Sequence, residues 1–123
     1  MPKFIPGGNR SQFGEESQEA MKVKTSHIQG MFGITLDDLC GKWGFPYPNY
    51  IKIDVDGIEI SILRSATQVL KHPNLKSVIV ELGTPIEQQE AIAIMKQSGL
   101  ELKSQSTRNW GETCFIFERA STA

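Results

Sequence analysis

The segment from Tyr50 to Leu70 constrains the fold most, because it joins a strand pattern to a helix pattern across a tight turn. In Tyr50–Val55 apolar residues alternate with polar ones, which is the period of a β-strand, and Asp56-Gly57 then supplies a turn signal. Apolar residues next recur at helical spacing until Pro73 ends the pattern. We therefore predict a strand followed by one amphipathic helix over residues 58–70.

Strand and helix patterns continue to alternate toward the C-terminus. The β-branched run Ser77–Leu82 predicts a central parallel strand that is covered on both faces. Thr84-Pro85 is typical of a helix start, and Gly99 supplies the C-terminal stop of that helix. The strand-like runs 100–105 and 113–118 are joined by a loop too short for a crossover helix. These two runs must therefore pair as an antiparallel hairpin.

The first third of the chain has a different character. Residues 1–34 are rich in proline and glycine and show no sustained apolar period, which predicts an irregular segment. Thr35 with an acid three residues later predicts a short helix that ends at about Trp43. We expect the Trp43 side chain in the core. We thus expect an irregular segment 1–34, an α/β domain 35–119 with an open sheet, and a tail 120–123.

Composition argues against nucleic-acid and membrane partners. A chain of 123 residues is enough for one domain, and 13 Lys plus Arg against 14 Asp plus Glu give no basic field for nucleic acid. No apolar run approaches the roughly 20 residues that cross a bilayer, and residues 1–13 lack the apolar core of a secretory signal. We expect a cytoplasmic protein without a membrane partner. Cys40 and Cys114 are far apart and predict free thiols, not a metal site.

Four acids follow the predicted parallel strands. Ligands bind outside the carboxyl ends of such strands, where we expect Asp54, Asp56, Glu59 and Glu81 to approach one crevice. A cluster of this kind suits proton transfer or a divalent cation. Structural roles remain open: Asp56 with Gly57 completes the turn, Glu59 complements a helix N-terminus, and Glu81 pairs with a lysine. A calcium loop is excluded, because its third oxygen ligand and distant glutamate are missing.

Three further residues are candidates for a pocket. Lys52 alternates with apolar neighbours, so it requires an acidic partner or a polar crevice on its face of the sheet. Asn109 and Trp110 lie at the tip of the predicted hairpin, where an amide and an aromatic ring suit a substrate pocket or an exposed loop.

Three motifs together resemble the C-terminal half of FkbM-type methyltransferases. They are Thr35-Leu36-Asp37-Asp38-Leu39, the strand–turn–helix Ile51–Glu59, and Val80-Glu81-Leu82, and the resemblance covers about residues 28–119. It implies a class I (Rossmann-like) fold with an antiparallel last strand, and transfer of a methyl group from S-adenosyl-L-methionine to a hydroxyl of a sugar, polyketide or similar small molecule. It also implies Asp54 as the residue that takes the proton or orients the acceptor, with Glu59 and Glu81 supporting the pocket. Lys52, Asp56 and Gly57 carry over as motif residues.

Elements of that family are missing from this sequence. No apolar strand precedes a glycine-rich turn near Gly7-Gly8, and no acid ending a second strand is present to hold a ribose. We therefore expect an incomplete methyltransferase that binds the cofactor weakly or not at all by itself. The uncovered edge of strand 50–55 predicts self-association or pairing with a missing N-terminal half. Two alternatives are a non-enzymatic interaction module and a receiver-like phosphoacceptor domain, although the latter requires an acidic pair after a first strand.

Overall fold

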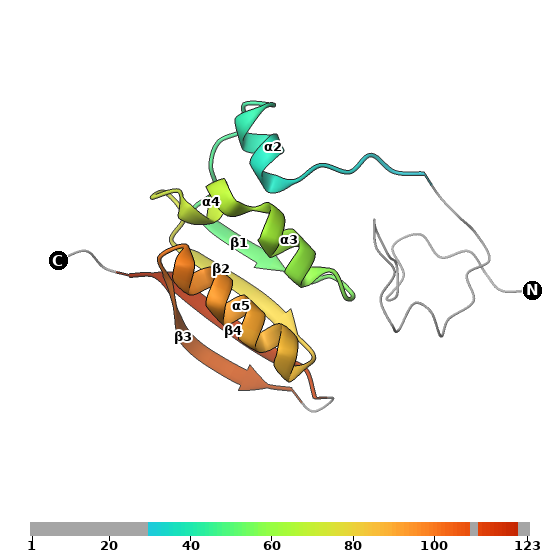
Figure 1. Cartoon of the computed structure of the whole chain (residues 1–123), viewed down its shortest axis with the longest axis vertical. Coiled ribbons are helices and arrows are strands. Elements are labelled where there is room, and N and C mark those ends of the chain that lie inside the picture. Colours follow the sequence, from blue (N-terminus) through green and yellow to red (C-terminus); the bar gives the residue numbers. More distant parts are fainter. Residues whose placement is uncertain (1–29, 109–110, 121–123) are drawn as a thin grey trace, which may run out of the picture.

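The computed structural model describes residues 30–108 and 111–120. The helices and strands follow in the order shown in Figure 1: α2 (Leu36–Gly41), β1 (Tyr50–Ile53), α3 (Glu59–Ser65), α4 (Thr67–Lys71), β2 (Ser77–Leu82), α5 (Pro85–Gln97), β3 (Leu100–Thr107) and β4 (Thr113–Arg119). The strands form one open sheet in the order β1-β2-β4-β3, in which β1 and β2 are parallel and β4 is antiparallel to both neighbours. The predicted parallel pair and C-terminal hairpin are confirmed.

The core lies between this sheet and the helices α3 and α5, which lie side by side over one of its faces (Figure 1). Ile53, Val80 and Phe115 form one row across the sheet and are all buried against the helices. On the opposite face, Ile79 is half-buried and Lys52 is exposed. In the described part of the chain, β2 is therefore fully buried on one face only, and the prediction of a strand covered on both faces is wrong there.

Helix α5 begins and ends as its sequence predicts. The Thr84 side chain accepts a hydrogen bond of 3.3 Å from the Glu87 N–H, and Pro85 occupies the first turn. The helix ends at Gln97, and Gly99 adopts a φ of +86° that favours glycine. Among the described helices, none is both long and apolar enough to cross a bilayer.

One predicted helix over 58–70 is in fact two, α3 and α4, which meet at Ala66. The break exposes new N-terminal N–H groups, and the Asp37 carboxylate satisfies them from another helix. The N–H groups of Gln68 and Val69 each donate to it at 2.9 Å, and the Thr67 hydroxyl donates at 3.1 Å. The split therefore depends on a long-range cap that periodicity alone does not reveal.

Two smaller predictions also require correction. Strand β1 ends at Ile53, so the following acids lie in the turn instead of the strand. Helix α2 ends at Gly41, with Leu36 packed on the core and Cys40 buried. Trp43 would lie on the same buried face as Leu36 and Cys40 only if the helix continued. Instead its side chain is 61% exposed, and its ring centroid lies 5.7 Å from that of Phe32. Trp43 is therefore not a core residue.

Arg119, at the end of β4, joins several segments on the far side of the domain. Its guanidinium donates to the carbonyl oxygens of Leu70 (2.7 Å), His72 (2.8 Å), Leu75 (3.0 Å) and Ser98 (2.5 Å). Carbonyl groups at helix ends lack intrahelical partners, and a planar guanidinium can satisfy several of them at once. This contact holds the ends of α4 and α5 against the sheet.

Candidate active site

The carboxyl ends of β1 and β2 bring Asp54 and Glu81 together. Ile53 is paired with Val80 in the parallel register, so Asp54 and Glu81 come next in line at the same edge of the sheet. Asp54 is exposed, whereas the Glu81 side chain is only 13% exposed. The Asp54 side chain acts on Glu81 through its charge and through side-chain hydrogen bonding, so the two carboxyl groups are close neighbours. Of the four acids expected at one crevice, these two meet at the strand ends.

Arg108 completes this group from the strand beyond β4. It follows β3, and its Nη2 lies 2.8 Å from Glu81 Oε1. Its backbone is fixed in the hairpin turn, because its N–H donates to the Glu112 carbonyl at 2.8 Å and its own carbonyl accepts from Gly111 at 3.0 Å. Glu81 thus pairs with an arginine and not with the lysine that the structural alternative suggested.

The environment of Glu81 favours retention of a proton. Burial is the main cause that raises the pKa of Glu81 above its ordinary 4.5, and the nearby charge of Asp54 raises it further. Arg108 lowers the pKa, and Glu112 raises it. A buried carboxyl group hydrogen-bonded to an exposed one is suited to accept and share a proton. We refer to Asp54, Glu81 and Arg108 as the Glu81 group.

The remaining predicted acids form a second set beside the first turn of α3. Glu59 is only 7% exposed, and its Oε1 accepts a hydrogen bond of 3.4 Å from the N–H of Gly57, which has a φ of +103°. Burial is the main cause that raises the pKa of Glu59, and the charges of Glu87 and Asp56 add to it. Glu59 therefore lies in the first turn of α3, where the structural alternative puts it, and it also closes the turn between β1 and α3.

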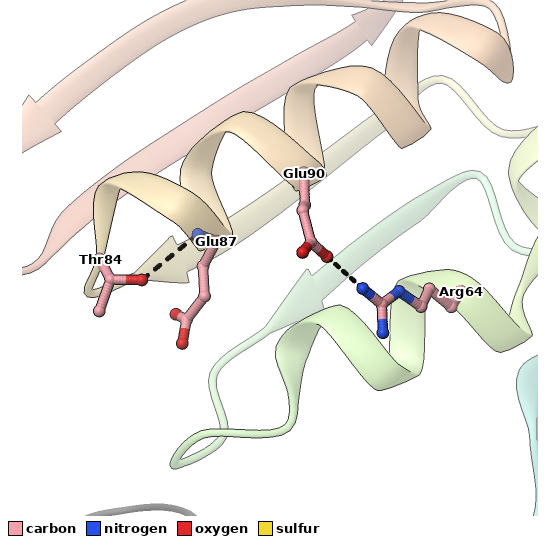
Figure 2. A network of polar contacts seen from close by, with 4 residues as sticks. All are labelled: Arg64, Thr84, Glu87 and Glu90. Atoms are coloured by element: carbon pink, nitrogen blue, oxygen red, sulfur yellow. Dashed lines mark hydrogen bonds and ion pairs between the residues drawn. The ribbon is translucent and has the colours of Figure 1, made fainter.

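Helix α5 faces this second set and is tied to α3. Figure 2 shows Glu87 and Glu90 extending from α5, and Glu90 forms an ion pair with Arg64 of α3. A groove of about 220 Å³ also lies between α5 and the helices α3 and α4, and its lining includes Leu63, Lys71 and Ile94. None of the predicted acids lines this groove, so it is separate from the candidate site.

The other predicted pocket residues are not joined to these sets. Lys52 is exposed on the face that carries Glu81, and it forms no salt bridge within residues 30–108 and 111–120. Asn109 and Trp110 lie outside the described residues. In the part of the chain that the structure describes, no group of three or more His, Cys, Asp or Glu residues is placed to hold a metal ion.

Sequence reasoning did not identify Arg108. A signal for it exists, because an antiparallel hairpin brings the residues around its turn to the same edge as the end of the neighbouring strand. Thr113 is paired with Leu82, so the turn that contains Arg108 lies beside the carboxyl end of β2. An arginine at that position is a natural partner for Glu81.

Comparisons with known proteins agree with the motifs. The sequence profile of the Methyltransferase FkbM domain family matches residues 3–110 of the chain. Hexuronic acid methyltransferase AglP of Haloferax volcanii is 29% identical over 79 residues, which cover 64% of this chain and 32% of that protein. The chain thus spans about one third of the length of this curated relative. No solved structure gives a significant match.

Proposed function

Because this chain belongs to the FkbM methyltransferase family, we propose that it transfers a methyl group from S-adenosyl-L-methionine to a hydroxyl of a small-molecule acceptor, such as a sugar or polyketide. The observation that carries the proposal is the Glu81 group. It brings two carboxyl groups to the carboxyl ends of two parallel strands, where ligands of open α/β sheets bind, and this position supports a role in taking up a proton. The name of the relative makes a hexuronic acid the first acceptor to test.

The described residues fit one part of this methyl donor. When bound, S-adenosyl-L-methionine supplies an activated methyl group on a positively charged sulfur. Asp54 and the acids beside it place negative charge at the strand ends, which complements such a cation. No glycine-rich turn follows β1 or β2, and such turns normally hold a nucleotide. We therefore propose that this chain by itself binds the donor weakly or not at all.

Within this proposal, Asp54 receives the proton of the acceptor. If bound, S-adenosyl-L-methionine would supply the methyl group and its sulfur would leave as a neutral thioether, so the part of this chain would be to take up the proton that the acceptor hydroxyl gives up. The proton moves to the exposed Asp54 carboxylate and is shared with Glu81 through their hydrogen bond. Lining up oxygen, methyl carbon and sulfur is the other requirement of the reaction.

The test is calorimetric titration of S-adenosylhomocysteine, followed by assays of labelled methyl transfer to hexuronic acids. Micromolar binding, about −8 kcal/mol, would show a donor site in this chain and overturn the proposal of weak binding. Once turnover is measured, Asp54→Asn is compared with the control Asp38→Asn. Asp38 is an acid on α2 that pairs with Lys42. We expect loss of turnover only in Asp54→Asn. Equal turnover at equal donor affinity would remove Asp54 from the mechanism.

An interaction module is the second candidate, and the position of β1 favours it. This strand is at the edge of the described sheet, and Tyr50 at its start is 71% exposed. Unpaired strand edges are templates for pairing with another chain. We propose a second copy of this chain as the partner. Light scattering over a range of concentrations tests this, because a monomer at all concentrations would exclude self-association.

A further inference from the structure

The contact between Arg108 and Glu81 suggests a role beyond that of a surface ion pair. The two residues belong to different strands, since Arg108 follows β3 and Glu81 lies in β2, with β4 between them. Their atoms Nη2 and Oε1 are 2.8 Å apart, and the Glu81 side chain is largely withdrawn from solvent. An ion pair to a carboxylate in this setting is screened less than one in open water.

We propose that Arg108 is a positioning residue of the candidate site: its ion pair holds the Glu81 carboxyl group in place at the end of β2 and opposes the effect of the neighbouring acids Asp54 and Glu112, so that the carboxyl pair remains able to take up the acceptor's proton. This inference rests on the proposed function. Arg108 does not contact the reacting atoms in this scheme. It acts through Glu81, which in turn shares the received proton with Asp54.

The charges around Glu81 explain why an arginine is required. Asp54 faces it from the end of β1, and Glu112 faces it from the residue before β4. Cys114 of β4 is its register partner, and Lys52 is one row away on the same face, opposite Ile79. Two neighbouring acids and partial burial all favour a protonated Glu81. A pair that already holds a proton at working pH cannot accept another from the substrate.

The backbone of Arg108 is held beside the start of β4. Its N–H donates to the Glu112 carbonyl at 2.8 Å, and its carbonyl accepts from the Gly111 N–H at 3.0 Å. These two hydrogen bonds fix the point from which the guanidinium reaches Glu81.

The experiment compares Arg108→Met, Arg108→Lys and the control Arg64→Met, which removes a different arginine from its ion pair with Glu90. The titration of the Glu81 carboxyl carbon is followed by NMR in the full chain, which needs neither donor nor acceptor. We expect an upward shift of the Glu81 midpoint in Arg108→Met, a smaller shift in Arg108→Lys and none in Arg64→Met. An unchanged midpoint in Arg108→Met would overturn the proposal.

The pH profile of methyl transfer separates positioning from a merely structural contact. We expect the acidic limb of the profile to move to higher pH in Arg108→Met and to return most of the way in Arg108→Lys. A shifted Glu81 midpoint with an unmoved profile would overturn the positioning role. Absence of methyl transfer by the parent protein at donor concentrations high enough to fill a weak site would refute the proposed function, whereas the NMR titration would still show whether Arg108 acts on Glu81.

Discussion

Asp37 Oδ1 accepts a hydrogen bond of 2.9 Å from the backbone N–H of Val69, a residue that lies 32 positions later in the chain. The same carboxylate accepts from Gln68 and from the Thr67 hydroxyl, so it caps the whole first turn of α4. The second of the two adjacent acids has another task. The backbone N–H of Asp38 donates a hydrogen bond to the Thr35 hydroxyl, which caps α2, and the Asp38 side chain pairs with the exposed Lys42.

This difference predicts unequal effects of two neighbouring substitutions. Asp37→Ala leaves the first N–H groups of α4 without their acceptor, so we expect a loss of about 1–2 kcal/mol in the free energy of unfolding. Asp38→Ala removes only a surface ion pair, which contributes at most about 0.5 kcal/mol. Urea unfolding of both variants measures the two losses. Equal losses would show that the Asp37 cap does not stabilise the fold.

Local signals predicted the fold where the interacting residues are close in the chain. Thr84 and Glu87 are three residues apart, and Gly99 directly follows the cap of α5, so the bounds of that helix are visible in the sequence. The division at Ala66 is not visible. It depends on Asp37, whose partners come from a different helix, and the apolar spacing of α3 and α4 continues across the break.

The candidate site follows the same rule. The meeting of Asp54 and Glu81 could be predicted, because parallel strands in register end at the same edge of a sheet. The sequence placed Glu59 with Asp56 but did not show that Glu87 lies near it as well, since that depends on how α5 packs against the turn before α3. Arg108 was missed because its partner lies across an intervening strand.

Arg119 provides a second stability prediction. Its guanidinium donates to the carbonyl groups of Leu70, His72, Leu75 and Ser98, and of these the His72 carbonyl also accepts from the Leu75 N–H. Arg119→Met removes the guanidinium donors from these four acceptors, and we expect a loss of about 2–4 kcal/mol in the free energy of unfolding. Arg119→Lys keeps the charge but not the planar fork, so it should recover less than half of this loss.

The matched control for Arg119 is Arg64→Met. Arg64 is largely exposed and makes one ion pair with Glu90 between α3 and α5 (Figure 2). We expect this substitution to change the free energy of unfolding by no more than about 0.5 kcal/mol. Chemical denaturation of the three variants, with an unchanged slope, gives the comparison. A loss in Arg119→Met as small as that in Arg64→Met would contradict the role assigned to Arg119.

Glu59 gives the fold a pH dependence whose sign can be stated. Burial raises the folded-state pKa of this carboxyl above its ordinary 4.5, so between these two values the folded protein binds more protons than the unfolded chain. The stability that Glu59 contributes is therefore fully present below about pH 4.5 and is lost as the pH rises through the raised pKa. Glu59→Gln keeps an oxygen that can accept from the Gly57 N–H but does not ionise. The variant should therefore gain stability relative to the parent as the pH rises from about 4 to about 8, as measured by urea unfolding at several pH values. A difference between the two proteins that does not change with pH would show that Glu59 is not held with a raised pKa in the fold.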